Sequence, residues 1–354
     1  MTVFVIGYYA VLIGASALAA YFHQRAIFMM LFSLTLVSFV MGIIGGVPAL
    51  RFVTIAAGIL ALAAGVSYCF REFLVAISGP ETAKELKSAP LTAAFGLFVI
   101  FTYAIAGIFA PWIAPFGQAE VVSSAFAPPD ETLLLGADQL GRDMFSRIIY
   151  GARNTVGLAL AATVLAFVMG ALAGLLAATK GGWFDNFMGR FADVIMSVPS
   201  LIFALLMLSI FGTSLLVIVV VVAVIYSPRV FRLTRAVAGN IVVMDYIEAA
   251  KLRGEGTWYL IRREILPNST APLIAEFGLE FCFVFLLIAG LSFLGLGIQP
   301  PTADWGSMVR ENATLISFGD ITPLIPAAAI ALLTVAVNFV VDWMLWRSSG
   351  LKES

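Results

Sequence analysis

A polar segment at residues 245–268 separates two strongly apolar segments in a chain of 354 residues that is 61% hydrophobic and only 12% charged. Its charged side chains would be costly in hydrocarbon, so we expect the segment to lie in water. Asp245 followed by Glu248 predicts a helix N-cap with a capping box, and Gly254 predicts the end of that helix. A second short helix is expected to follow and to end at Pro267. The segment therefore predicts a compact surface of two short helices that contacts a soluble partner.

Two acidic residues lie in the apolar segment that follows. Glu276 and Glu280 are four residues apart and would share one face of a helix. Ionisable side chains inside a membrane usually mark a functional site, so a cation-binding role on a transport pathway is one interpretation. The alternative is that both acids lie near the membrane surface and pair with Arg262 or Arg263. The residues alone leave both interpretations open.

Several other kinds of chemistry are disfavoured by the composition. One His and two Cys residues are too few for a dense site of soft metal ligands, and no lysine follows the glycines of a nucleotide-binding P-loop. We therefore expect no metal, no cofactor and no ATP hydrolysis in this chain. A net charge of −1 gives no electrostatic case for binding nucleic acid. A membrane-embedded enzyme is disfavoured because convergent catalytic groups are lacking.

The elements that must position these residues are membrane helices. A mean hydropathy of +1.03, with 29 Phe against 20 Lys and Arg, indicates a membrane protein. A helix needs about 20 apolar residues to cross a bilayer, so we predict an all-α polytopic membrane protein with about nine transmembrane helices. The expected spans are residues 3–22, 27–48, 52–70, 93–114, 154–179, 191–211, 214–231, 271–297 and 323–346.

The distribution of basic residues predicts the orientation of these spans. Roughly three quarters of the Lys and Arg residues fall on the side of the membrane that carries segment 245–268. The N-terminus is therefore expected outside and the C-terminus in the cytoplasm. Residues 1–22 are expected to be a span rather than a cleaved signal peptide, because no basic residue precedes their apolar stretch.

A polar stretch with turn-forming residues at both ends predicts a boundary between two membrane regions. The expected parts are a three-helix module at 1–72, a cytoplasmic linker at 73–92, a main membrane domain at 93–346 and a cytoplasmic tail at 347–354. The first module either docks, binds lipid or regulates, or it merely pads the bundle. The lack of intramembrane charge there favours padding.

Glycine and proline residues make further predictions about the helices. Pro199 lies inside an expected span, where neighbouring helices can satisfy the carbonyl that it frees. Gly170 and Gly174 predict a close contact between two helices. Gly295 is expected to end the eighth span, and Trp305 is expected at the outer surface of the membrane.

The segment that precedes the fifth span predicts an amphipathic helix at the outer surface, with apolar side chains on one face and polar side chains on the other. Contact with a protein that delivers substrate and simple anchoring at the membrane surface are both open as its role. The polar candidates for that contact are Asp138, Gly141, Arg142, Asp143 and Arg147.

Three blocks of residues, in this order along the chain, resemble one known family. They are Gly136 to Arg153, then Glu248-Ala-Ala with Gly254 and Leu266-Pro267, and finally Leu291 to Gly306. Together they resemble the permease subunits of ABC importers, the binding-protein-dependent inner membrane components, in the dipeptide, oligopeptide and nickel branch. Within that branch the C-type permease is most similar. The resemblance covers about residues 90–346.

The resemblance implies a six-helix type I importer core at 93–346 and a coupling loop at 245–268 that docks on an ATPase subunit. Glu264 departs from the family pattern just before Ile-Leu-Pro. Asp193 and Asp342 also match aspartates of the branch, and we expect both to pair with nearby arginines. The residues that the resemblance assigns to coupling are Asp245, Glu248, Ala249, Ala250, Gly254, Leu266 and Pro267.

The implied assembly contains a second (B-type) permease, two ABC ATPases that bind ATP and Mg²⁺, an extracytoplasmic solute-binding protein and membrane lipid. The expected function is ATP-driven import of peptides by alternating access in a bacterial or archaeal cytoplasmic membrane. Nickel or other metal chelates and sugar or amine conjugates are the alternative cargoes. A non-transporting receptor or scaffold built on the same fold is the alternative of a different class.

Overall fold

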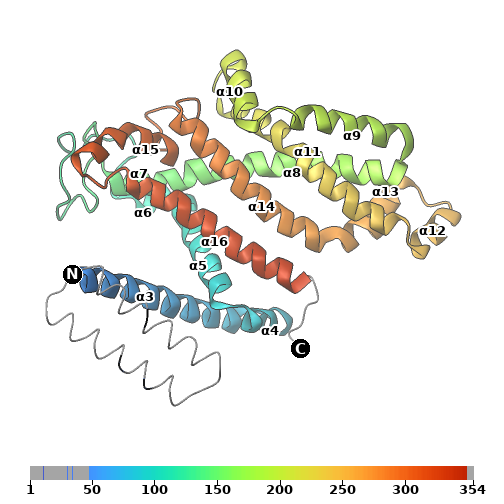
Figure 1. The fold of residues 1–354 in the computed structure, drawn as a ribbon, viewed down its shortest axis with the longest axis horizontal. Coiled ribbons are helices and arrows are strands. Elements are labelled where there is room, and N and C mark those ends of the chain that lie inside the picture. Colours follow the sequence, from blue (N-terminus) through green and yellow to red (C-terminus); the bar gives the residue numbers. More distant parts are fainter. Residues whose placement is uncertain (1–10, 12–29, 31–33, 35–47, 349–354) are drawn as a thin grey trace. The chain divides into compact units, whose positions relative to one another are not determined.

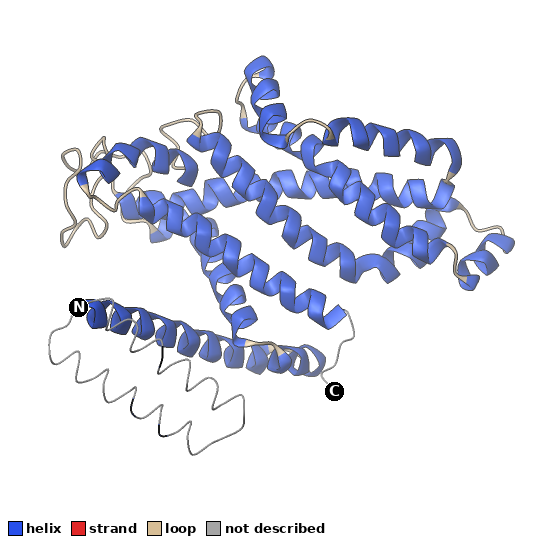
Figure 2. Ribbon diagram, viewed as in Figure 1, coloured by secondary structure: helices blue, strands red, loops and turns tan. Residues whose placement is uncertain are grey.

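The computed structural model describes residues 48–348 together with Val11, Met30 and Leu34. Within this described part, helices and connecting loops make up the fold and no strand occurs, as Figure 2 shows. The all-α prediction is therefore confirmed for these residues. The spans expected at 3–22 and 27–48 lie almost entirely outside them.

The chain divides into two compact units, Met1–Ala83 and Lys84–Ser354. In the first unit, helix α3 (Pro48–Ile77) covers the third expected span and extends beyond it. Helix α4 (Pro80–Ser88) then occupies much of the stretch that was expected to be a linker, and it is a charged helix with Glu81 in its first turn and Lys87 in its last. The helix ends therefore match the charges that a helix dipole favours.

The second unit is built from long helices and their short connections (Figure 1). In chain order these are α5 (Leu91–Ile108), α6 (Ala110–Ile113), α7 (Met144–Gly151), the π-helical η1 (Ala152–Val156), α8 (Gly157–Lys180), α9 (Gly182–Met196), α10 (Ser200–Phe211), α11 (Leu215–Val242), α12 (Asp245–Leu252), α13 (Thr257–Tyr259), the π-helical η2 (Leu260–Ile265), α14 (Leu266–Phe293), α15 (Trp305–Asn312), the 3₁₀-helical η3 (Ala313–Phe318) and α16 (Leu324–Ser348).

Five helical stretches of the described residues are long and apolar enough to cross a membrane, and a sixth is added if the bent pair α9 and α10 counts as one span. The five are Leu91–Ile108, Met144–Lys180, Leu215–Val242, Thr257–Phe293 and Leu324–Arg347. The chain is thus a multi-pass membrane protein. The full count of nine helices and the orientation stay predictions.

The span expected at 191–211 is not one continuous helix. Helices α9 and α10 meet at an angle of 86° across a break between Met196 and Ser200. Pro199 lies in this break, and a proline disfavours helical backbone in the residue before it. The neighbouring helices do not restore a continuous helix here.

The predicted helix end at Pro267 is also wrong, because one continuous helix runs from Thr257 to Phe293. Pro267 stands in the first turn of α14, directly after the π-helical η2. A π-helical turn widens the helix and shifts its hydrogen bonds, which lets a proline stand where a regular α-helix would be kinked or broken. Helix α11 likewise continues to Val242, beyond the expected end at 231.

The main core lies where α8, α11, α14, α15 and α16 pack together. The expected contact at Gly170 and Gly174 is confirmed: a Cβ atom added there would lie 2.4 Å from the Ser227 carbonyl oxygen and 2.8 Å from that of Phe231. Only glycine therefore allows α8 to approach α11 this closely. Trp305 is fully buried in this core, so its expected position at the membrane surface is wrong.

Candidate coupling site

Helix α12 begins differently from the prediction. Its N-cap is Met244, and no side chain caps the helix, so the predicted capping box of Asp245 and Glu248 is wrong. Both acids lie instead inside the first turn, where a negative charge is favoured by the helix dipole. Lys251 lies in the last turn, where a positive charge is favoured. The charges therefore suit the helix without side-chain caps.

The predicted end of α12 at Gly254 is confirmed. Gly254 has a φ of +83°, and its N–H donates to the Lys251 carbonyl at 2.9 Å. The Glu255 N–H donates to the Ala250 carbonyl at 3.2 Å. These two bonds form the Schellman motif, whose left-handed position favours glycine.

One face of α12 is anchored in the protein. Ile247 and Ala250 are fully buried in a cluster with Ile261 and Ile265 of η2, and Leu175 of α8 joins the same cluster. Their burial fixes α12 against the ends of several long helices. Any force on α12 is therefore applied directly to the helices of the membrane part.

The other face of α12 and its flanks are exposed. Glu248 and Ala249 point away from the cluster, so the two adjacent alanines serve opposite faces. Large apolar side chains are exposed beside them, with Leu252 at 84%, Val243 at 79% and Trp258 at 56%. Exposed apolar side chains rimmed by charges are typical of a surface that binds another protein. We call residues 243–258 the coupling surface.

Segment 245–268 is completed by a contact between α12 and α14. The Asn268 side-chain amide donates to the Tyr246 hydroxyl at 3.3 Å and to the Glu264 carbonyl at 2.7 Å. Leu266 and Pro267 are exposed next to this contact. Glu264, the departure from the family pattern, is half-buried and contributes its backbone oxygen here.

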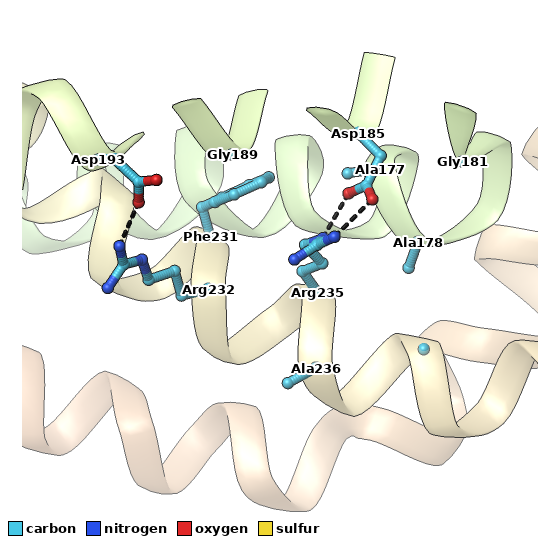
Figure 3. Close-up of a pocket in the computed structure, with 11 residues that line it drawn as sticks. Ala177, Ala178, Gly181, Asp185, Gly189, Asp193, Phe231, Arg232, Arg235 and Ala236 are labelled. Carbon is cyan, nitrogen blue, oxygen red and sulfur yellow. Dashed lines mark hydrogen bonds and ion pairs between the residues drawn. The ribbon is translucent and has the colours of Figure 1, made fainter. Parts of the chain in front are cut away.

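A cavity of about 610 Å³ lies between α8, α9 and α11 (Figure 3). Two ion pairs join α9 to α11 along it, Asp193 with Arg232 and Asp185 with Arg235. The predicted arginine partner of Asp193 is thereby confirmed. Asp342 is exposed and has no arginine partner in the part of the chain that the structure describes, so that prediction is wrong.

The polar residues expected at the outer surface are buried instead. The Asp138 carboxylate accepts a hydrogen bond from Arg142 Nε at 2.7 Å and lies 3.3 Å from Arg147 Nε. Glu311 Oε2 accepts from the Nη2 atoms of both arginines, at 2.9 and 3.3 Å. None of these four side chains is more than 6% exposed. We call them the Asp138 network.

The prediction of an amphipathic surface helix is therefore wrong for its polar face, whose side chains are buried and form contacts inside the protein. Asp143 is the N-cap of α7 and accepts from the Ser146 N–H at 2.8 Å. Gly141 has a φ of +77°, and a Cβ atom there would lie 2.0 Å from the Ser123 carbonyl oxygen. Glu311, far away in the sequence, gave no signal, because the partner of a buried arginine is set by the fold.

The first and third sequence blocks meet beside this network. Asp304 caps α15 through the Ser307 N–H at 2.9 Å and accepts from the Thr155 hydroxyl at 2.8 Å. Burial raises the pKa of the Asp304 carboxyl above its ordinary value. Trp305 fits against Gly151, where a Cβ atom would lie 2.4 Å from the indole ring. The coupling surface lies at the other end of α8 and α14 (Figure 1).

Glu280 is buried between α11 and α14, and its Oε1 lies 3.1 Å from Nε of Arg229. It therefore does not pair with Arg262 or Arg263, although one of the two interpretations of the sequence expected such a pair. Glu276 is half-buried one turn earlier. Arg229 was not a sequence candidate because it falls at the expected end of a span, whereas α11 continues well beyond it.

Comparison with known proteins fits this arrangement. The family described as "Binding-protein-dependent transport system inner membrane component" matches residues 166–346, which include all of α12. The chain belongs to this family. As an inner membrane component, it is a permease rather than a catalytic subunit, and bacterial relatives place such permeases in the inner membrane.

Individual relatives share much of the permease sequence. The di/tripeptide transport system permease protein DppC of Pseudomonas aeruginosa is 35% identical over 70% of this chain and 84% of its own length. The probable D,D-dipeptide transport system permease protein DdpC of Escherichia coli is 32% identical over 78% of this chain and 94% of its own. The glutathione transport system permease protein GsiD of Pectobacterium atrosepticum is 33% identical over 71% and 84%.

Proposed function

We propose that this permease is the C-type subunit of an ATP-driven importer that moves peptides across the cytoplasmic membrane by alternating access. The names of its relatives support peptides as cargo, because they describe dipeptide, di/tripeptide and glutathione transport. The remaining partners are a B-type permease, two ATPases that bind ATP and Mg²⁺, and an extracytoplasmic binding protein. This chain needs no cofactor of its own.

The observation that carries the proposal is the two-sided burial of α12. Ile247 and Ala250 anchor the helix in a cluster that includes α8 and α11, while Glu248, Ala249 and Leu252 are exposed for a partner. When ATP draws the two ATPases together, a contact on the exposed face moves the ends of the long helices. Two arrangements of the pathway, biased by that contact, are what alternating access requires.

The proposal includes the topology. The coupling surface faces the cytoplasm, and the end with the Asp138 network faces the binding protein, so nine helices place the N-terminus outside. Gly141 and Asp143 shape the loop at that end through backbone geometry, and Asp138, Arg142 and Arg147 hold it rigid. The network thus supports the surface that meets the binding protein rather than contacting it through its own charges.

The test is assembly and stimulated turnover. The chain, co-expressed with the B-type permease, the two ATPases and the binding protein of its transport system, should co-purify with the ATPases. Peptide-loaded binding protein should stimulate ATP hydrolysis by the complex in liposomes. A complex that contains no ATPase, or ATP turnover that ignores the loaded binding protein, would refute the proposal. Stimulation by a metal chelate or a sugar conjugate, and not by peptides, would refute only the cargo.

A further inference from the structure

The ion pair between Arg229 of α11 and Glu280 of α14 has no part in the coupling mechanism proposed above. Arg229 Nε lies 3.1 Å from Glu280 Oε1, and the two side chains differ in exposure, with 39% for Arg229 and 1% for Glu280. Both residues stand in helices that are apolar enough to cross a membrane. Charged side chains in such helices are costly and usually mark a site.

The guanidinium group of Arg229 lies between a carboxylate and two aromatic rings. Glu280 Oε1 lies 3.1 Å from its Nε as an ion pair without a hydrogen bond. The central carbon of the guanidinium lies 4.2 Å above the centroid of the Phe283 ring and 5.9 Å from that of the Tyr226 ring. Among the described residues, its two terminal amino groups make no hydrogen bond. An arginine offers five N–H donors in a planar fork, so most of its capacity is left for a ligand.

Arg229 lines a cavity of about 370 Å³. Its walls come from the break between α9 and α10 at Pro199 and Ser200, from Tyr226 and Arg229 of α11, and from Phe283 of α14. The size lies within the range of about 300–1,000 Å³ that is usual for small-molecule sites. Because the chain is bent rather than helical at Pro199, a continuous helix does not fill this space.

We propose that this cavity is a substrate subsite in which Arg229 receives the terminal carboxylate of a peptide. The inference rests on the proposed function and names the group that the permease recognises. A guanidinium fork binds a carboxylate through two parallel hydrogen bonds. Glu280 is a positioning residue, which orients the fork from behind and neutralises Arg229 while the cavity is empty.

The charge balance favours a peptide over a simple anion. With Arg229 and Glu280 paired, a bound anion would leave one uncompensated negative charge among apolar helices, which is costly. A peptide with free ends carries an ammonium together with its carboxylate and adds no net charge. The aromatic wall of the cavity, which includes Phe203 and Phe283, suits apolar peptide side chains.

The test compares a dipeptide with its C-terminal amide in the complete importer in liposomes. Both are supplied at concentrations that saturate the binding protein, and uptake is measured for each. Since a substitution in this chain leaves the binding protein unchanged, any preference of that protein cancels when acid-to-amide ratios are compared. Arg229→Gln should lower uptake of the free acid about tenfold or more and that of the amide far less.

Two further variants sharpen the result. Arg229→Lys keeps a positive charge toward Glu280 but loses the fork, so the acid-to-amide ratio should still fall. If the complex with Arg229→Gln does not assemble, the acid-to-amide ratio is measured with Arg229→Lys instead. Glu280→Gln should move the ratio in the same direction by a smaller factor. Arg190→Gln, an exposed arginine of α9 outside the cavity, is the matched control and should leave the ratio unchanged.

The outcomes separate the two proposals. If Arg229→Gln or Arg229→Lys lowers uptake of acid and amide by the same factor, the ion pair is only a structural brace and the subsite is refuted. If the wild-type complex shows neither peptide uptake nor ATP hydrolysis stimulated by the peptide-loaded binding protein, the proposed function itself fails. Stimulated hydrolysis with an unchanged ratio overturns the subsite alone.

Discussion

The coupling surface and the Asp138 network are polar regions at opposite ends of the same long helices, and they use their charges in opposite ways. Around α12 the charged side chains are exposed and the apolar residues Ile247 and Ala250 provide the anchor. In the network the charged side chains are themselves the anchor, with Arg147 fully buried. A surface that must bind and release a partner keeps its charges in water, whereas a rigid support pairs them inside.

The network should be the more sensitive of the two regions. Replacing Arg147 with Leu leaves Asp138 and Glu311 with one arginine between them, and breaking a buried pair costs about 3–5 kcal/mol. We expect a large loss of folded protein, measured as the apparent melting temperature of the purified complex in detergent. Glu131→Gln, an exposed acid of the same loop, is the control and should melt like the wild type. An Arg147→Leu variant with the same melting temperature as the wild type would show that the network does not support this end of the protein.

Within the coupling region, the anchored and exposed faces of α12 should separate stability from coupling. Ile247→Ala removes a fully buried side chain and should destabilise the region by about 2–5 kcal/mol. Leu252→Ala removes an exposed one and should leave melting unchanged while weakening the contact with the ATPase. Melting temperature and stimulated ATP hydrolysis, measured together, check both. A Leu252→Ala variant with normal ATPase binding would remove that side chain from the coupling surface.

Much of the coupling region was predictable from local sequence, and the network was not. Gly254 ends a helix because of a backbone preference that a single residue carries. The capping box failed because Asp245 was already inside the helix, one residue beyond the position that its side chain would need. Burial of Arg142 and Arg147 depends on Glu311, which lies far along the chain in another sequence block, and no local pattern encodes that contact.

The continuity of the long helices was also beyond local rules. Pro199 and Pro267 are the same residue type in apolar surroundings, yet the chain bends sharply at the first and continues at the second. A π-helical turn precedes Pro267 and accommodates it, whereas the backbone before Pro199 leaves the helix. Sequence identifies where a helix is vulnerable, and packing decides whether it breaks.

Gly254 offers a sharper separation of coupling from folding. Gly254→Val places a β-branched residue at a φ of +83°, which costs about 1–2 kcal/mol and should loosen the end of α12. Membrane insertion and assembly should be normal, but ATP hydrolysis should no longer drive uptake efficiently. Gly79→Val is the matched control, because Gly79 is exposed, has no positive φ, leaves open space for a side chain and lies outside the coupling surface. Normal transport by Gly254→Val would argue against a role for this helix end.

The smallest expected effect is a pH dependence of stability at the end of the protein that holds the Asp138 network. Burial raises the pKa of Asp304, so its stabilising contribution is complete below the unfolded pKa of about 4 and is lost as pH rises through the folded pKa. An uncharged amide at this position would resemble the protonated carboxyl. The melting temperature of the wild type minus that of Asp304→Asn should therefore fall as pH rises above about 4.

Asp320, which lies nearby in the sequence, should show a pH dependence of stability with the opposite sign. Hydrogen bonds from Thr322 lower the pKa of this exposed carboxyl, so its contribution is present above its unfolded pKa and is lost as pH falls through the folded value. The same difference measured for Asp320→Asn should therefore rise with pH. If the melting-temperature difference for Asp304→Asn also rises with pH, the hydrogen bonds from Ser307 and Thr155 outweigh the effect of burial. Asp304 is then held as an ionised carboxylate, in the way that an exposed loop holds one.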